Sequence, residues 1–297
     1  MMTTKKILFI AIIFTGMLFT SCSSDDDGPA TTTLTINILN LNMLEGNVVY
    51  KAWIRTNSNT IELGTFQDVD FPKNFEVVSD ELDAATDFFI TIEDNTANSN
   101  TPSSTRIASA RLSTNSNTAQ ISSVDAIGDF SSISGSFVLR TFTGSAPSNE
   151  PNGIWFTNEL SATTNLSSAL SLPTLNPGWK YEAWVVLSDR NGNNVNLSLG
   201  KFSDTSQSDE NDIFSGQGDA PQIPGEDFLN TSAGNLINIA FPADITNRNV
   251  FITVEPENGD NSNEPFDIQV LSTNNATANQ VNTMSTNNFF ITGTLEK

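Results

Sequence analysis

Apolar and polar residues alternate in the same way in two separate stretches of this chain. The sequence Tyr-x-Ala-Trp, followed by aliphatic residues, occurs in residues 48–54 and again in residues 179–187. Each copy is followed by an Asn-containing turn and by a Leu-Gly-x-Phe segment, at residues 63–66 and 199–202. Alternation on both sides of a turn predicts a β-hairpin. Two hairpins with the same layout predict two copies of one domain.

Two further pairs of matching segments follow the hairpins in the same order. Residues 89–93, Phe-Ile-Thr-Ile-Glu, match residues 251–255, Phe-Ile-Thr-Val-Glu. Residues 133–137, Ile-Ser-Gly-Ser-Phe, match residues 291–295, Ile-Thr-Gly-Thr-Leu. Three motifs that recur in one order predict a tandem duplication.

The composition favours strands over helices in both copies. Thr, Ser and Asn are abundant, and no stretch has the periodicity of an amphipathic helix. We therefore predict an all-β protein with two tandem β-sandwiches of the immunoglobulin-like type. The first sandwich is predicted over residues 31–143 and the second over residues 152–297. Residues 144–151 contain two prolines and no apolar run, which predicts a linker.

The N-terminus has the pattern of a secretion signal over residues 1–21. A pair of lysines precedes an apolar stretch, residues 7–19, that is too short to span a bilayer comfortably. Cys22, the only cysteine, stands where the signal of a bacterial lipoprotein ends. We predict that Cys22 is acylated and anchors the protein to a membrane. Phe19 replaces the leucine that is usual in such signals, so a free thiol at Cys22 is the alternative.

Residues 22–30 are predicted to form a short acidic tether. Asp25, Asp26 and Asp27 follow the cysteine closely. This run resembles the export signal that sends lipoproteins of Bacteroidota to the outer face of the outer membrane. Display on the cell surface is therefore predicted, with the periplasmic face of the outer membrane as the alternative. A solvated tether, extended by charge repulsion, explains the same residues.

The charge balance excludes several classes of function. With 13 Lys and Arg against 34 Asp and Glu, the chain has a formal net charge of −21. Such a charge repels polyphosphates and anionic lipids, so no nucleic-acid partner is predicted. The chain has no histidine, which excludes His-based triads and His-ligated metal sites. With its one cysteine acylated, the chain has neither disulfide nor thiol chemistry.

Two tryptophans are candidate ligand residues. In the hairpin strands, alternation places Trp53 and Trp184 on the face that carries charged neighbours, opposite the aliphatic face. Aromatic side chains on such a face stack on sugars and cations. The alternative is that each tryptophan is covered by a neighbouring strand or loop, as large aromatics in sandwiches usually are.

Carboxylates supply the other candidate residues. Glycoside hydrolysis needs two carboxylates about 5 to 9 Å apart. Glu226 and Asp227 are adjacent, and neighbours on an extended segment point in opposite directions, so they do not form such a pair. Glu226 with the distant Glu255 or Glu182 stays an open alternative. We expect Glu226 or Asp227 instead to tether a loop through backbone N–H groups.

Residues 203–227 form the most acidic stretch and are the candidate calcium site. Asp209, Asp212 and Asp219 lie in this stretch among Gly, Ser and Gln. Carboxylates in a loop are ligands that Ca²⁺ prefers. Their spacing does not fit an EF-hand loop, and a solvated loop explains them equally, so no cofactor is predicted beyond this candidate calcium.

The second predicted domain resembles a known family in several segments. These are Gly-Ile-Trp-Phe at 153–156, Trp-Lys-Tyr-Glu-Ala-Trp at 179–184, Pro-Gly-Glu-Asp-Phe-Leu at 224–229 and Val-Glu-Pro-Glu at 254–257. Together they resemble the extracytoplasmic C-terminal domain of RskA-type anti-sigma-K factors, in a stand-alone lipoprotein form. The resemblance implies a β-sandwich outside the cytoplasm. It is weaker over residues 31–143, where the Pro-Gly-Glu-Asp-Phe segment is absent.

The resemblance does not carry inhibition of a sigma factor to this chain. In the family, a cytoplasmic helical segment binds the sigma factor, and a transmembrane helix joins that segment to the outer domain. Neither pattern is recognised in this sequence, and the protein is expected outside the cytoplasm. No direct contact with a sigma factor is therefore expected here. We predict a non-enzymatic envelope protein that binds, scaffolds or senses an unknown protein or glycan. Two alternatives stay open: an envelope-sensing regulator that acts through a membrane partner, and a surface lipoprotein that binds or processes carbohydrate.

Overall fold

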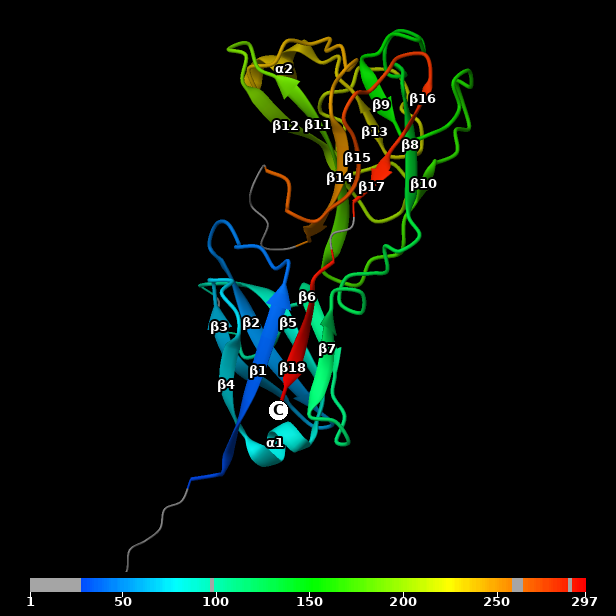
Figure 1. Ribbon diagram of the computed structural model, residues 1–297. Coiled ribbons are helices and arrows are strands. Elements are labelled where there is room, and N and C mark those ends of the chain that lie inside the picture. The colour runs from blue at the N-terminus through cyan, green and yellow to red at the C-terminus, as the bar shows by residue number, and fades with distance from the viewer. Residues whose placement is uncertain (1–27, 97–98, 258–263, 288–289) are drawn as a thin grey trace, which may run out of the picture.

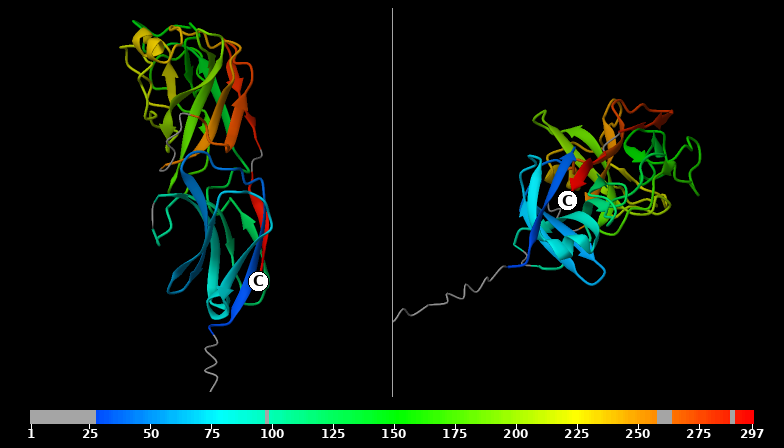
Figure 2. Two further views of the ribbon diagram at one scale, coloured as in Figure 1. Left: turned by 90° about the vertical axis from the view of Figure 1, so that its left-hand side faces the viewer. Right: turned by 60° about the horizontal axis from the view of Figure 1, so that its bottom comes forward.

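The computed structural model describes residues 28–96, 99–257, 264–287 and 290–297 (Figure 1). These residues form antiparallel strands and two short helices, α1 (Ser79–Asp83) and α2 (Thr231–Leu236), which confirms the predicted all-β sandwich class. The strands build two lobes that are stacked end to end, called lobe 1 and lobe 2 below (Figure 2). Cys22 and the run Asp25, Asp26 and Asp27 lie outside the described residues.

Lobe 1 is one eight-stranded antiparallel sheet with the order β3-β2-β5-β6-β7-β18-β1-β4. The sheet curls until its edge strands β3 and β4 approach each other, which gives it a nearly barrel-like form. Alternate residues of each strand, such as Leu34 and Ile36, fill its interior. The strands are β1 (Thr31–Leu39), β2 (Val48–Thr56), β3 (Thr60–Phe66), β4 (Lys73–Val78), β5 (Ala85–Asp94), β6 (Arg106–Arg111), β7 (Thr118–Ser122) and β18 (Thr292–Glu296).

Lobe 2 is a sandwich of two five-stranded sheets. The two sheets approach closely at Gly135 of one sheet, where a Cβ atom would lie 2.7 Å from the end of the Leu271 side chain of the other. One sheet holds β8 (Ser134–Leu139), β9 (Gly153–Trp155), β10 (Leu170–Ser171), β13 (Gly225–Asp227) and β16 (Val281–Thr283). The other holds β11 (Trp179–Ser188), β12 (Asn194–Phe202), β14 (Val250–Pro256), β15 (Gln269–Thr273) and β17 (Ser285–Thr286).

The strand pairing differs from the predicted domain boundaries 31–143 and 152–297. Strand β8 pairs with β9, β10 and β16 and so belongs to lobe 2, whereas the C-terminal strand β18 lies between β1 and β7 of lobe 1. Lobe 2 is therefore inserted between β7 and β18. The predicted linker 144–151 lies inside lobe 2, where Thr141 and Ser148 form an antiparallel bridge. Local composition cannot reveal this, because the pairing joins strands that are distant in sequence.

The lobes contact each other through backbone and side-chain hydrogen bonds. Trp179 Nε1–H donates to the carbonyl of Arg106 at 2.8 Å, and the Thr105 hydroxyl donates to the carbonyl of Gly178 at 3.3 Å. Gly178 has a φ of +95°, and a Cβ atom there would lie 2.6 Å from the backbone of Ser104. The two chain crossings and this close contact hold the lobes together.

Candidate functional site

Trp53 and Trp184, the candidate ligand platforms, are both buried. Trp53 has no exposed surface and Trp184 exposes 2% of its surface. Both faces of β2 and β11 are covered along most of their length, so the aromatic face is packed as the aliphatic face is. Neither indole can stack on a sugar or a cation in this structure, which corrects the platform hypothesis in favour of its alternative.

In lobe 1, Trp53 begins a chain of buried hydrogen bonds that we call the lobe 1 relay. Its Nε1–H donates to Thr91 Oγ1 at 2.8 Å, and the Thr91 hydroxyl donates to Glu93 Oε1 at 2.5 Å. Glu93 Oε1 also accepts from the backbone N–H of Ser103 at 2.8 Å. These bonds compensate the loss of water around each polar group.

The lobe 2 relay repeats the same arrangement. Trp184 Nε1–H donates to Thr253 Oγ1 at 2.8 Å, and the Thr253 hydroxyl donates to Glu255 Oε1. Glu255 Oε1 accepts from the backbone N–H of Phe266 at 2.9 Å. The candidate ligand residue Glu255 has no exposed surface, so its role in this structure is internal.

Both relays end on loops that lie between the lobes. Ser103 lies in the loop after β5, and its hydroxyl donates to the carbonyl of Ile92 at 2.8 Å. Phe266 lies in the equivalent loop after β14, with its ring 6.0 Å from that of Trp179. Ile92 and Phe266 both line the space between the lobes. The relays therefore fix two walls of one cleft.

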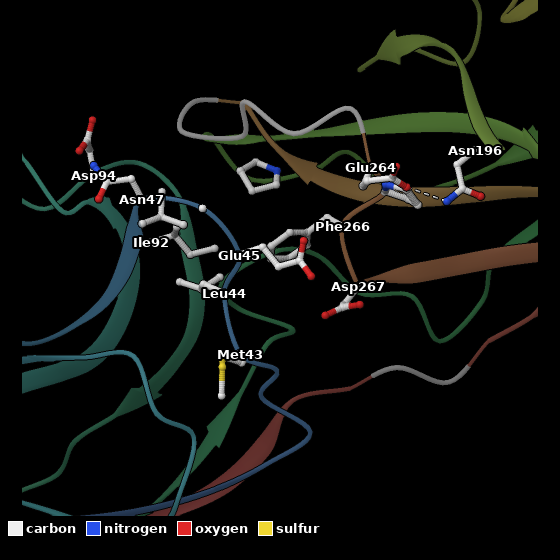
Figure 3. Close-up of a pocket in the computed structure, with 14 residues that line it drawn as sticks. Met43, Leu44, Glu45, Asn47, Ile92, Asp94, Asn196, Glu264, Phe266 and Asp267 are labelled. Atoms are coloured by element: carbon white, nitrogen blue, oxygen red, sulfur yellow. Dashed lines mark hydrogen bonds between the residues drawn. The ribbon is translucent and has the colours of Figure 1, made fainter. Parts of the chain in front are cut away.

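The cleft between the lobes has a volume of about 560 Å³ (Figure 3). Residues 43–48 and 264–267 form its two principal walls, with Ile92, Asp94 and further residues of lobe 2. This volume lies within the range of about 300–1,000 Å³ that small-molecule sites occupy. It is called the inter-lobe cleft below.

The inter-lobe cleft is acidic. Glu45 and Asp94 come from lobe 1, and Glu264 and Asp267 come from lobe 2. All four carboxylates are on exposed residues, and the described lining residues include no lysine or arginine. The side chain of Asn196 donates to Glu264 Oε2 at 2.9 Å (Figure 3). The charged side chains among the described lining residues are therefore all acidic.

The lobe 1 wall of the cleft combines this charge with apolar surface. Met43 is 65% exposed, and Leu44 beside it is partly buried. Their loop is held by the hydroxyl of the buried Tyr50, which donates to the carbonyl of Asn42 at 2.8 Å. Burial, with the nearby charge of Asp267, raises the pKa of Tyr50, so this donor keeps its proton.

Ile92, Glu93 and Phe266 were not among the residues that the sequence singled out. The available signal was the Thr-x-Glu pattern that ends both residues 89–93 and residues 251–255. A repeated polar pair in a repeated apolar strand indicates a buried network, because a strand with two covered faces must satisfy its polar side chains internally.

Asp227 is a structural acceptor. Its Oδ2 accepts from the backbone N–H groups of Phe142 and Thr143 at 2.8 and 2.6 Å and from the Thr143 hydroxyl at 2.7 Å, and its Oδ1 accepts from Trp155 Nε1–H at 2.8 Å. Burial raises the pKa of Asp227, while these hydrogen bonds oppose that rise. The residue ties β13 to the segment that follows β8 and to Trp155 of β9.

Glu226 has the opposite environment. It has no exposed surface, and no described residue makes a hydrogen bond of ordinary geometry to either of its carboxylate oxygens. Burial raises its pKa to about 9, and the charges of Asp209 and Asp227 add to the rise, although the nearby Ser215 hydroxyl opposes it. Glu226 is therefore a neutral acid at pH 7, on a different sheet from Glu255.

The candidate calcium ligands do not converge. Asp209 is partly buried and accepts from the backbone N–H of Gly225 at 2.7 Å, whereas Asp212 and Asp219 are exposed. Burial raises the pKa of Asp209 to about 7. Within the described ranges, no group of three Asp, Glu, Cys or His side chains is arranged to hold a metal ion.

Comparisons with known proteins add no information about the fold or the site. No protein-family model, no curated protein and no solved structure matches the chain. Among the residues with described positions, no helix is both long enough and apolar enough to cross a membrane.

Proposed function

We propose that this chain is a non-enzymatic, lipid-anchored binding protein of the cell envelope that holds its ligand in the inter-lobe cleft. The observation that carries the proposal is the cleft itself, with walls from both lobes and a relay behind each wall. Two relays that fix Ile92 and Phe266 give the cleft a preorganised shape. Preorganisation favours binding because less conformational entropy is lost when the ligand arrives.

The carboxylates support binding in preference to catalysis. Asp227 and Glu255 are buried and accept hydrogen bonds from the fold itself. Glu226 is fully buried in lobe 2. A general acid or base must reach the proton that it transfers, and these three side chains have no access to a ligand.

The position of the tether supports display of the cleft away from the membrane. Strand β1 begins at the end of lobe 1 that is farthest from lobe 2 (Figure 1). A tether of residues 22–30 that starts at an acylated Cys22 would place lobe 1 next to the lipid surface. The cleft would then face outward, beyond the length of lobe 1.

The anchor is tested by Cys22→Ala and by protease accessibility. We expect the wild-type protein in the membrane fraction and the variant in the soluble fraction, because the acyl chains supply the membrane affinity. Protease added to intact cells should digest the wild-type protein if it is displayed on the surface. Retention of the variant in the membrane fraction would contradict the anchor, and protection from protease until lysis would place the lobes in the periplasm.

The cleft is tested by a photo-crosslinking amino acid at Met43 in intact cells. Leu236 is the matched control, because it is an exposed apolar residue at 89% exposure on α2, away from the cleft. We expect a discrete adduct from position 43 and none from position 236. Equal labelling from both positions, or no adduct from position 43, would contradict the cleft as the binding site.

The resemblance to RskA-type outer domains supports a second proposal, an envelope sensor that signals through a membrane partner. Both proposals use the same cleft. An adduct between position 43 and an integral membrane protein would favour the sensor, and an adduct with an extracellular polymer or surface protein would favour the binding protein.

A further inference from the structure

We propose that the inter-lobe cleft binds a basic peptide segment, in which Lys or Arg side chains pair with the cleft carboxylates and neighbouring apolar side chains pack on its walls. This proposal rests on the cleft being the binding site, as proposed above. It adds the chemical class of the ligand.

The charge of the cleft selects a cationic ligand. Glu45, Asp94, Glu264 and Asp267 are exposed around one cavity, and none of its described lining residues is basic. Asp94 accepts from the backbone N–H and the hydroxyl of Thr96 through Oδ1, which leaves Oδ2 for a ligand. An acidic ligand would meet repulsion from both walls.

The spacing of the carboxylates selects an extended cation over a single ion. They come from separate segments of both lobes, and no described group of three converges as a metal site requires. Ca²⁺ needs six to eight oxygen ligands at one point. Several charges distributed along a chain match this arrangement better, because each can meet a different carboxylate.

The apolar surface of the cleft selects a peptide over a polyamine. Met43 is 65% exposed although it is a large apolar residue, and Leu44 and Phe266 are only partly buried beside it. Apolar peptide side chains would cover this surface, and the stems of Lys and Arg would add to the contact. A basic side chain would also meet the face of the Phe266 ring.

The test is fluorescence anisotropy with labelled synthetic ten-residue peptides and the full chain carrying Cys22→Ala. One peptide alternates Lys and Leu, one alternates Ser and Leu, and one alternates Glu and Leu. The cleft variant is Glu45→Gln with Asp267→Asn. The control variant is Asp83→Asn with Asp219→Asn, which removes the same charge at exposed positions outside the cleft.

We expect the Lys-Leu peptide to bind most tightly, and its affinity to fall with added salt. The cleft variant should bind it about 3- to 10-fold more weakly, because each exposed ion pair contributes about 0.2–1 kcal/mol. The control variant should change the affinity less than twofold. This control separates the cleft from the attraction that any polycation feels for a protein with a net charge of −21.

Three other results would overturn the proposal. If the Ser-Leu peptide binds as tightly and the cleft variant binds both peptides equally, the site takes peptides but not by charge. If both variants weaken binding equally, the attraction belongs to the whole surface. If spermidine or Ca²⁺ displaces the Lys-Leu peptide when both supply the same concentration of positive charge, the ligand is a small cation and not a peptide. The adduct at position 43 in cells judges the cleft independently of these results.

Discussion

The two relays differ most at the carboxylate that ends them. In lobe 1, Glu93 exposes 8% of its surface. In lobe 2, Glu255 has no exposed surface. The same hydrogen-bonded unit therefore ends on a slightly exposed glutamate in one lobe and on a fully buried one in the other. The hydrogen bonds are alike in the two lobes, and the exposure of the carboxylate residue differs.

The hairpins around the relays show the same contrast. Lys51 of β2 pairs with Glu62 at 3.1 Å, whereas Glu182 occupies the equivalent position of β11 and pairs with Lys201 at 3.7 Å. The sign of the buried charge is reversed, and an opposite charge stands across the hairpin in each lobe. The same hairpin position therefore accommodates either polarity of an ion pair.

The lobes also differ in how much each depends on the C-terminal end of the chain. Deletion of residues 291–297 removes β18, which pairs with β1 on one side and β7 on the other. We expect the cost to exceed the 5–15 kcal/mol that stabilises a typical domain, so lobe 1 unfolds. Hydrogen exchange should show loss of protection in β1 and β7 and retained protection in β11 and β14. Retained protection in β1 would contradict the observed topology.

Removal of the central hydroxyl should affect the two relays unequally. We expect Thr253→Val to lower the free energy of unfolding by about 3 kcal/mol and Thr91→Val by about 2 kcal/mol, because each leaves an indole N–H without its acceptor and a carboxylate with one donor fewer. The larger loss is expected in lobe 2 because Glu255 is fully buried, whereas Glu93 exposes 8% of its surface. Hydrogen exchange resolved by lobe measures both effects, and equal losses would mean that this difference in exposure does not distinguish the relays. Thr294→Val, on an exposed side of β18, is the control for the loss of a hydroxyl.

Glu226 has no counterpart in lobe 1 and gives lobe 2 a pH dependence. Its pKa is about 9 in the folded protein against an ordinary value of 4.5, so between these values the folded state holds a proton that the unfolded state has released. Stability should fall as pH rises through this window, by up to about 1.4 kcal/mol per pH unit. Below pH 4.5 both states are protonated and the penalty disappears.

The Glu226→Gln variant removes this penalty and should be more stable than the wild type at pH 8, with a smaller difference at pH 5. Urea unfolding followed by tryptophan fluorescence measures it, because three of the four tryptophans, Trp155, Trp179 and Trp184, lie in lobe 2. Glu150→Gln, at an exposed residue, is the control and should leave the pH dependence unchanged. If the wild type is instead more stable to urea than Glu226→Gln at pH 8, then Glu226 is ionised and paired.

The reversed ion pairs should give the smallest effects. Double-mutant cycles on Lys51 with Glu62 and on Glu182 with Lys201 should each give a coupling of about 0.2–1 kcal/mol, since one partner of each pair is partly exposed. Both couplings should decrease in 0.5 M salt. A coupling above about 2 kcal/mol in one lobe only would mean that polarity matters to the relay beside it.

The sequence by itself determined the all-β class, the two hairpins and the recurrence of the strand that ends in Thr-x-Glu. These features depend on alternation and turn chemistry within about ten residues, so they are visible locally. The same local logic separated Glu226 from Asp227, because neighbours on a strand face opposite ways. Their different environments, one with four hydrogen bonds and one with none of ordinary geometry, follow from that alternation.

Only the tertiary structure decided where β8 and β18 pair, and hence that lobe 2 is inserted into lobe 1. The similarity of residues 133–137 and 291–295 predicted equivalent places in two successive domains, but each strand pairs across a long sequence separation that no local pattern encodes. The same is true of the burial of Trp53 and Trp184 and of the cleft. A second covered face and a cavity between lobes arise from packing of segments that meet only in three dimensions.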